Sequence, residues 1–319
     1  MLHPDFLPPA RPNHGTSHPA TTTSCPASGV TAHTALERTV LSATTAQWFG
    51  VLANLHPAVH LGCTPVAQLG IQGPLAPVRL EHHPVLPQSA CGRLQPNLAE
   101  HATLSAVQEA HPAGILHALE VRDARGRQAH RIVVPAGAGL PAWQEFTRAH
   151  AVPPTAPTPW FPANHSASAR RVGALSGRVR FLRQRLDERS PEVRRLTFPH
   201  LVSLLQQAIA SELAIRTTLY NRAVILGSTW IPEFQAPDLT PSDDPGLRIS
   251  RFFGSDTGLQ LHHDPLVLLV LWTGVCSCCG KEKWAIEVGT PEGELALALT
   301  APDESQEEAW RGFLTAHLD

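Results

Sequence analysis

An internal repeat is the feature that most constrains how this chain folds. The segment "AWQEFTRAHA" at residues 142–151 returns as "AWRGFLTAHL" at 309–318, an offset of 167 residues. From Ala118 to His150, 11 of 33 positions are identical at that offset without a gap, whereas chance gives about two from ordinary composition. Further upstream, "AVHLGCT" (58–64) matches "AVILGST" (223–229) at an offset of 165. The chain is therefore predicted to contain two copies of one unit.

A repeat of this length indicates a duplicated domain, because solenoid repeats run about 20–50 residues. A length of 319 residues also favours two domains. We predict four segments, which are a disordered arm rich in Pro, Thr and Ser (1–35), a first repeat (36–152), a Pro-rich linker (153–170) and a second repeat (171–319).

Both repeats are expected to follow one order of elements. A helix comes first, since "HLVSLLQQAIASEL" places Leu201, Leu204 and Leu205 on one face. Strands follow, beginning at "AVHLGC" or "AVILGS". A hairpin of "ALEV" with "HRIVV", or "AIEV" with "LALAL", then leads into a closing helix. The Trp and Phe of that helix share a face that should pack on the sheet, and His150 and His317 in its last turn are expected to be structural.

Composition excludes several classes of partner. A net charge of −2 and an aromatic fraction of 6% predict no nucleic-acid partner, because stacking platforms are scarce. The longest apolar run, "PLVLLVLWTGVC", is shorter than the roughly 20 residues that cross a bilayer, so no membrane segment is expected. Six cysteines in a chain of this length are not typical of a disulfide framework. We expect a cytoplasmic protein, and its oligomeric state is not predicted.

Three crowded cysteines form the most conspicuous local cluster. Structural zinc sites take cysteines at a two-residue gap with a second pair elsewhere, whereas Cys276 and Cys278 have a gap of one. Cys276 and Cys279 match the spacing of a redox pair formally. We expect all three to be small buried side chains that hold no metal and form no obligatory disulfide.

Paired histidines and an arginine-rich segment are the other candidates for ligand binding. Adjacent histidines on a strand point to opposite faces, so His82–His83 and His262–His263 can each give one ligand to a given site. Surface or edge-strand positions are the alternative for these side chains. Residues 169–195 hold nine Arg against three acids. This segment is a nucleic-acid face, a set of donors for an anionic ligand, or an amphipathic helix with a solvated basic face. No Gly-rich phosphate loop, nucleophile elbow or catalytic triad is present, so no catalytic residue is assigned.

In its hairpins and closing helices the chain resembles the tandem-duplicated HemS/ChuX-type haem-utilisation proteins. In "ALEVRDARGRQAHRIVVPAGAGLPAWQEFTRAH", a strand, an Asp-x-x-Gly turn and a second strand lead into a helix with Ala-Trp. "AIEVGTPEGELALALTAPDESQEEAWRGFLTAHL" is similar to the family's C-terminal ending. The resemblance implies an α+β fold of two homologous modules, each a large, mainly antiparallel sheet with packed helices. It also implies a cytoplasmic protein that binds haem between a sheet and the linker helix.

One position departs from the family pattern. Tandem members carry the axial histidine in a His-x-Phe-Phe segment, whose best match here is "VRFL", with Phe181 retained and Val179 at the histidine position. The resemblance therefore implies a different axial ligand, and the candidates are His165, His262 and His263. The candidate cations for the haem propionates are Arg170, Arg171 and Arg178.

The leading hypothesis is a haem-binding protein of haem utilisation, trafficking or degradation, with haem as its partner. A role as a carrier is favoured over an enzymatic, haem-degrading role. The alternative is a non-enzymatic scaffold or interaction protein that kept the fold and lost the haem site, as Val179 suggests.

Overall fold

The computed structural model describes most of both predicted repeats. The described residues are 35–43, 45–52, 54–55, 57–73, 75–77, 92–96, 101–111, 114–123, 126–134, 136–153, 193–221, 224–239, 248–263, 268–275, 282–290 and 295–318. All of the predicted arm except Ala35, which begins a strand, and most of the linker lie outside this set, so both stay predictions.

The first half alternates short helices with long strands. Its elements are β1 (Ala35–Leu41), α1 (Thr45–Leu52), β2 (Val59–Cys63), β3 (Ala67–Gln72), β4 (Leu75–Pro77), β5 (Gly92–Pro96), β6 (His101–His111), β7 (Gly114–Asp123), β8 (Gln128–Val134) and α2 (Leu140–His150). A strand therefore precedes the helix that we expected to come first. The sequence of β1 shows little alternation of apolar and polar residues. Its partner in the sheet is β6, which lies more than sixty residues later in the chain.

The second half has the same kinds of element. They are β9 (Val193–Leu196), α4 (Phe198–Ala210), β10 (Ile215–Tyr220), β11 (Val224–Trp230), β12 (Phe234–Leu239), β13 (Arg248–Phe253), β14 (Thr257–His263), β15 (Leu268–Val275), β16 (Glu282–Gly289), β17 (Leu295–Thr300), η3 (Glu304–Gln306) and α5 (Glu307–Leu318). The predicted helix over "HLVSLLQQAIASEL" is confirmed as α4, with Leu201, Leu204 and Leu205 buried.

Two sheets carry the fold, which is α+β as predicted. The nine-stranded sheet has the order β1-β6-β7-β8-β2-β3-β14-β13-β12, and the eight-stranded sheet has the order β4-β5-β11-β10-β17-β16-β15-β9. Within the described strands, only β4 and β5 pair in parallel. Large antiparallel sheets are therefore confirmed.

Each sheet takes strands from both halves, which differs from the expectation that each module builds its own sheet. The second half's β14 pairs with β3, and the first half's β5 pairs with β11. An unpaired β3 or β11 would expose a row of backbone N–H and C=O groups, and the exchanged strands cover both edges.

The two halves share one strand order, although the duplication itself stays a prediction. The order β1-β6-β7-β8-β2-β3 in one sheet has its counterpart in β9-β15-β16-β17-β10-β11 in the other. Glu120 pairs with Arg131 in the first hairpin, and Glu287 pairs with Ala298 in the second, so the register is the same at an offset of 167. By this order β2 corresponds to β10, which corrects the match of 58–64 with 223–229, since the described residues of the latter segment lie in β11.

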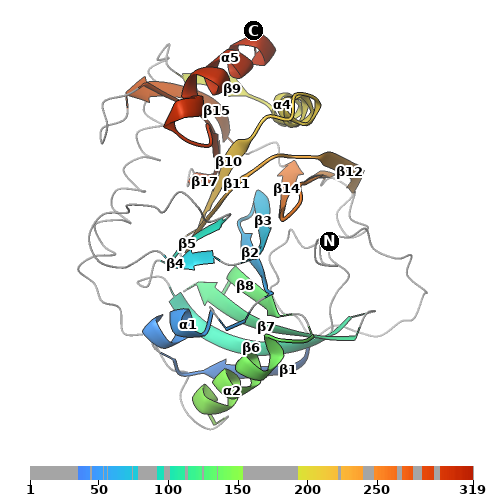
Figure 1. Ribbon diagram of the computed structural model, residues 1–319, viewed down its shortest axis with the longest axis vertical. Helices are drawn as coiled ribbons and strands as arrows, with labels where there is room; N and C mark the ends of the chain where they lie inside the picture. The colour runs from blue at the N-terminus through green and yellow to red at the C-terminus, as the bar shows by residue number, and fades with distance from the viewer. Residues whose placement is uncertain are drawn as a thin grey trace.

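The sheets meet at the centre of the molecule, with the helices at its two ends (Figure 1). A Cβ atom on Gly62 would lie 3.0 Å from Leu226 Cδ2 and 3.1 Å from Leu219 Cδ2, so glycine allows β2 to approach the second sheet closely. Asn221 donates to the carbonyl oxygens of Cys63 (3.0 Å) and Ala129 (2.7 Å). One large apolar core continues from one sheet to the other.

Candidate functional site

The predicted ligands His262 and His263 lie at the end of β14, on opposite faces of the nine-stranded sheet. His262 is buried, and both of its ring nitrogens are used. Nδ1 lies 3.2 Å from the carbonyl oxygen of Pro65, and Nε2 lies 2.9 Å from Nε2 of Gln260. A neutral ring fits both contacts, with Nδ1–H donating to Pro65 and Nε2 accepting from the Gln260 amide.

Burial lowers the pKa of His262 to about 4, and the nearby His263 adds to this, although the bond to Pro65 opposes it. The imidazole is therefore neutral at pH 7 and held from both sides. This arrangement is that of a structural histidine, since neither ring nitrogen has a lone pair left for a ligand.

His263 has a different environment, on the face that meets α4. Its Nε2 lies 3.0 Å from Oγ of Ser250, and Ser250 in turn donates to Oδ1 of Asp238 at 2.8 Å. Because the single hydroxyl proton goes to the carboxylate, Ser250 accepts from Nε2–H of His263. The lone pair of this ring therefore lies on Nδ1, for which the described part of the chain contains no hydrogen-bond partner.

Asp238, on β12, anchors the hydrogen-bond relay that runs from His263 through Ser250 to its own carboxylate. It also accepts hydrogen bonds from Nε of Arg248 (2.6 Å) and Nε2 of Gln235 (3.2 Å). Burial alone would raise the pKa of Asp238, but the hydrogen bonds from Ser250 and Arg248 and the charge of Arg248 lower it below its usual range. The carboxylate is thus charged at neutral pH and fixes the direction of the relay.

The imidazole of His263 also stacks on Phe198, the first residue of α4. The ring centroids are 4.8 Å apart and the planes differ by 8°. Burial lowers the pKa of His263, the charge of Asp238 raises it, and that of Arg248 lowers it, with a net decrease. His263 is thus a mainly neutral, oriented imidazole at the boundary between α4 and the sheet.

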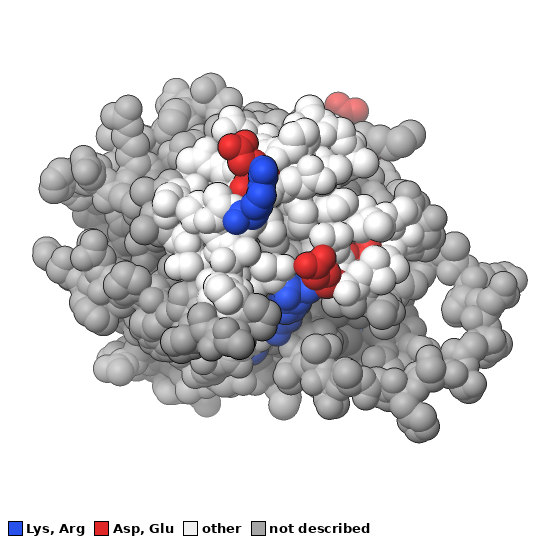
Figure 2. Space-filling model, turned by 90° about the horizontal axis from the view of Figure 1, so that it is seen from below, with Lys and Arg blue, Asp and Glu red and all other residues white. Residues whose placement is uncertain are grey.

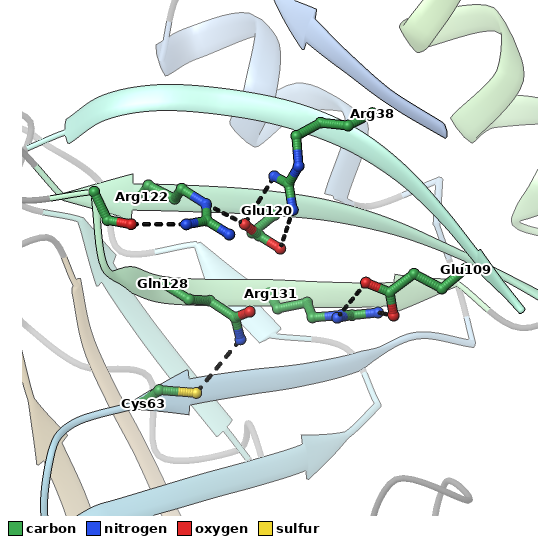
Figure 3. A network of polar contacts seen from close by, with 8 residues as sticks. Arg38, Cys63, Glu109, Glu120, Arg122, Gln128 and Arg131 are labelled. Carbon is green, nitrogen blue, oxygen red and sulfur yellow. Dashed lines mark hydrogen bonds and ion pairs between the residues drawn. The ribbon is translucent and has the colours of Figure 1, made fainter. Parts of the chain in front are cut away.

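A network of charged side chains lies on the opposite face of the same sheet, which the sequence did not predict (Figure 3). Arg131 on β8 makes a two-bond contact with Glu109 on β6, at 3.1 and 2.5 Å. Glu120 on β7 accepts from Arg38 at 2.9 Å and from Arg122 at 2.6 Å. The charged residues of "EVR" and the single Arg131 of β8 were the available signal of this network, but which residues pair depends on strand register.

Glu120 is nearly inaccessible to solvent. Burial would raise the pKa of its carboxyl, but the hydrogen bond and charge of Arg38, with the charges of Arg122 and Arg131, lower it. The carboxyl of Glu120 is therefore ionised at neutral pH and offsets the charges of the arginines beside it.

Two further buried histidines were also not anticipated. His60 on β2 and His130 on β8 stack with centroids 5.6 Å apart, and Trp48 of α1 packs edge-on to His130 at 6.0 Å. Both rings lie in the layer between the sheet and its helices. The sequence signal that could have indicated them is a single histidine within a mostly apolar predicted strand.

Several predicted residues lie outside the described part of the chain. These are His82, His83, His165, Arg170, Arg171, Arg178, Val179, Cys276, Cys278 and Cys279. Their predicted roles stay predictions. Within the described ranges, no three His, Cys, Asp or Glu side chains come together as a metal site.

In the view of Figure 2, the described surface has no large patch of only positive or only negative side chains. Cationic and acidic side chains lie next to one another on this face, which is the lower end of the molecule in Figure 1. Among the described residues, no helix is both long and apolar enough to cross a membrane.

Comparison with known proteins identifies the fold. No family model matches the sequence, and no curated protein matches it either. Among solved structures, the chain is similar to ChuS of E. coli, a haem oxygenase, with a TM-score of 0.68 and 13% identity over 89% of this chain and 90% of ChuS. It is also similar to haem-loaded PhuS of Pseudomonas aeruginosa, a haem-binding protein, with a TM-score of 0.62 and 17% identity over 88% of this chain and 87% of PhuS. The chain therefore has the ChuS/PhuS fold.

Proposed function

We propose that this chain is a haem-binding protein of haem utilisation, trafficking or degradation. The observation that carries the proposal is the fold shared with ChuS, a haem oxygenase, and PhuS, a haem-binding protein, along 89% and 88% of the chain. We further propose that the two halves, 36–152 and 171–319, are homologous modules of a cytoplasmic protein.

Haem requires an axial ligand, apolar contact on its faces and cations for its propionates. Of the described candidates, His263 fits the first requirement, because its Nε2–H is held by Ser250 and Asp238 while Nδ1 keeps a lone pair. Metal-ligating histidines commonly donate their other N–H in this way, which fixes the tautomer. His262 does not fit, because both of its nitrogens are bonded.

The remaining proposed ligands come from the linker region. His165 is the second axial candidate, and Arg170, Arg171 and Arg178 are the proposed cations. Bound haem supplies a redox-active iron, and the chain's own residues hold and shield it. We favour carriage over degradation, because the sequence has no recognisable catalytic set.

Titration with haemin, followed through the Soret band, tests this proposal. We expect saturable one-to-one binding. One of the two variants His263→Ala and His165→Ala should lose this binding, and that variant identifies the axial ligand. The binding should persist in His262→Gln and in His317→Ala, an exposed control in the last turn of α5. Binding no stronger than that of an unrelated histidine-containing protein would leave the alternative of a scaffold without a haem site.

A further inference from the structure

The hydrogen-bond relay on His263 ends in a charged group, whereas the partners of its neighbour His262 are neutral. His262 is 1% exposed, and its ring nitrogens are bonded to a backbone carbonyl oxygen and to a side-chain amide. His263 is only half-buried, and its Nε2 leads through Ser250 to the carboxylate of Asp238. Water can satisfy a ring nitrogen at a half-buried position, so the relay is not needed to avoid an unpaired group. What the relay adds is a fixed position for the ring proton.

The negative charge of Asp238 sets the direction of this relay. A carboxylate only accepts hydrogen bonds, so Asp238 takes the hydroxyl proton of Ser250 at 2.8 Å. The hydroxyl oxygen is then left as an acceptor for Nε2–H of His263 at 3.0 Å. An amide in place of the carboxylate would also allow the reverse order, because its NH2 group can donate to the hydroxyl and the hydroxyl to Nε2. The charge of the side chain, rather than its shape, therefore selects the tautomer.

The carboxylate of Asp238 is itself held at both oxygens. Arg248 donates to Oδ2 at 2.6 Å, whereas Ser250 and Gln235 donate to Oδ1 at 2.8 and 3.2 Å. The side chain of Arg248 is 64% exposed and that of Asp238 is 19% exposed, so this ion pair lies at the surface. One oxygen thus serves the ion pair, and the other serves the relay.

Phe198 fixes the plane of the same imidazole. It is the first residue of α4, and its ring lies 4.8 Å from that of His263 with the planes 8° apart. Helix α4 and strands β12 and β14 come together at this point (Figure 1). Stacking covers a face of the imidazole, whereas the lone pair of Nδ1 lies in the plane of the ring. Since both the ring plane and the proton are fixed, this lone pair has one defined direction.

We propose that Asp238 is a positioning residue, which acts through Ser250 to keep the proton of His263 on Nε2 and the lone pair on Nδ1. Asp238 thereby controls the strength of His263 as a ligand, because a hydrogen bond from the second nitrogen of a ligating histidine fixes its tautomer and raises its basicity. The control of haem binding rests on the proposed function. The tautomer, in contrast, is a property of the ligand-free chain.

Nitrogen-15 NMR of the ligand-free full chain tests the tautomer, because protonated and unprotonated imidazole nitrogens differ strongly in chemical shift. We expect the proton of His263 on Nε2 in the wild type, and a substantial population with the proton on Nδ1 in Asp238→Asn and in Ser250→Ala. Glu233→Gln, which removes an exposed carboxylate next to β12, should keep the wild-type signals. A wild-type ring with its proton on Nδ1, or the same tautomer in wild type and Asp238→Asn, would overturn the proposal.

Haemin titration of the same variants tests the control of ligand strength. We expect Asp238→Asn and Ser250→Ala to bind haemin about tenfold more weakly than the wild type, as the loss of the second partner of a ligating histidine predicts. Glu233→Gln should bind as the wild type does. A changed tautomer with an unchanged affinity would overturn the proposed control. If the wild type binds no haemin, the proposed function fails, and the NMR comparison still decides whether Asp238 positions the ring.

Discussion

The indole nitrogen of Trp143 donates a hydrogen bond of 3.1 Å to the carbonyl oxygen of Ala118, which ties α2 to β7. At an offset of 167 residues, Trp310 donates one of 2.9 Å to the carbonyl oxygen of Trp284, which ties α5 to β16. The repeated Ala-Trp signature therefore ties each closing helix to a strand through the indole N–H, although Trp284 is one position before the equivalent of Ala118. The second ring pair of each helix also matches. Phe146 packs on His150 at 4.7 Å, and Phe313 packs on His317 at 4.8 Å.

Replacing either tryptophan by phenylalanine should destabilise the protein by about 1–2 kcal/mol, because a carbonyl loses its donor while most of the apolar contact remains. Urea denaturation followed by circular dichroism measures this change. The exposed Glu145→Gln on α2 serves as the control and should leave the midpoint unchanged. A tryptophan variant as stable as the wild type would show that the indole N–H is not needed to close the helix.

Glu120→Gln should cost about 3 kcal/mol, because Arg38 and Arg122 lose their shared counter-charge in a buried site. The pKa of Glu120 is lowered on folding, so its stabilisation is present above the ordinary glutamate pKa of about 4.3 and is lost as pH falls below it. The free energies of unfolding of wild type and variant should therefore converge in acid. A difference that stays constant from pH 7 to pH 3 would contradict this account.

His262 should make the protein sensitive to mild acid. Its pKa falls from 6.5 to about 4 on folding, so the unfolded state binds the extra proton between these values. Stability is complete above pH 6.5 and falls by roughly 3 kcal/mol as pH drops to about 4. The unfolding free energy of His262→Gln should vary less with pH over this range. If NMR shows the His262 ring protonated at pH 6, the prediction fails.

Neither half should fold alone as a stable monomer, because each sheet is completed by strands of the other half. Residues 1–153 would leave β3 without β14, and residues 154–319 would leave β11 without β5. We expect isolated halves to associate or precipitate, and co-expressed halves to purify together through a tag on one of them. An isolated half that is monomeric and unfolds cooperatively would show that the strand exchange is dispensable.

Local and repeated features of the fold were predictable from sequence. The hairpins and closing helices follow from periodicity and from the repeat, and their register agrees between halves. The exchange of β14 and β5 was not predictable, because no short-range pattern says which distant strand covers an edge. The same limit applies to β1, whose partner β6 is remote in sequence.

The candidate site was predictable in part. Period-two alternation correctly placed His262 and His263 on opposite faces of a strand. Which of the two rings has both nitrogens hydrogen-bonded depends on distant residues. These are Pro65, 197 positions away from His262, and Ser250 and Asp238 on neighbouring strands.

The most direct test of the central claim is the amount of haem that the protein retains. The full chain is mixed with excess haemin and gel-filtered, and the iron-to-protein ratio is measured in the protein peak together with the Soret absorbance. We predict a ratio close to one in the wild type and a clear loss in His263→Ala or His165→Ala, but not in His317→Ala. A wild-type peak with no more haem than an unrelated histidine-containing protein would contradict the account.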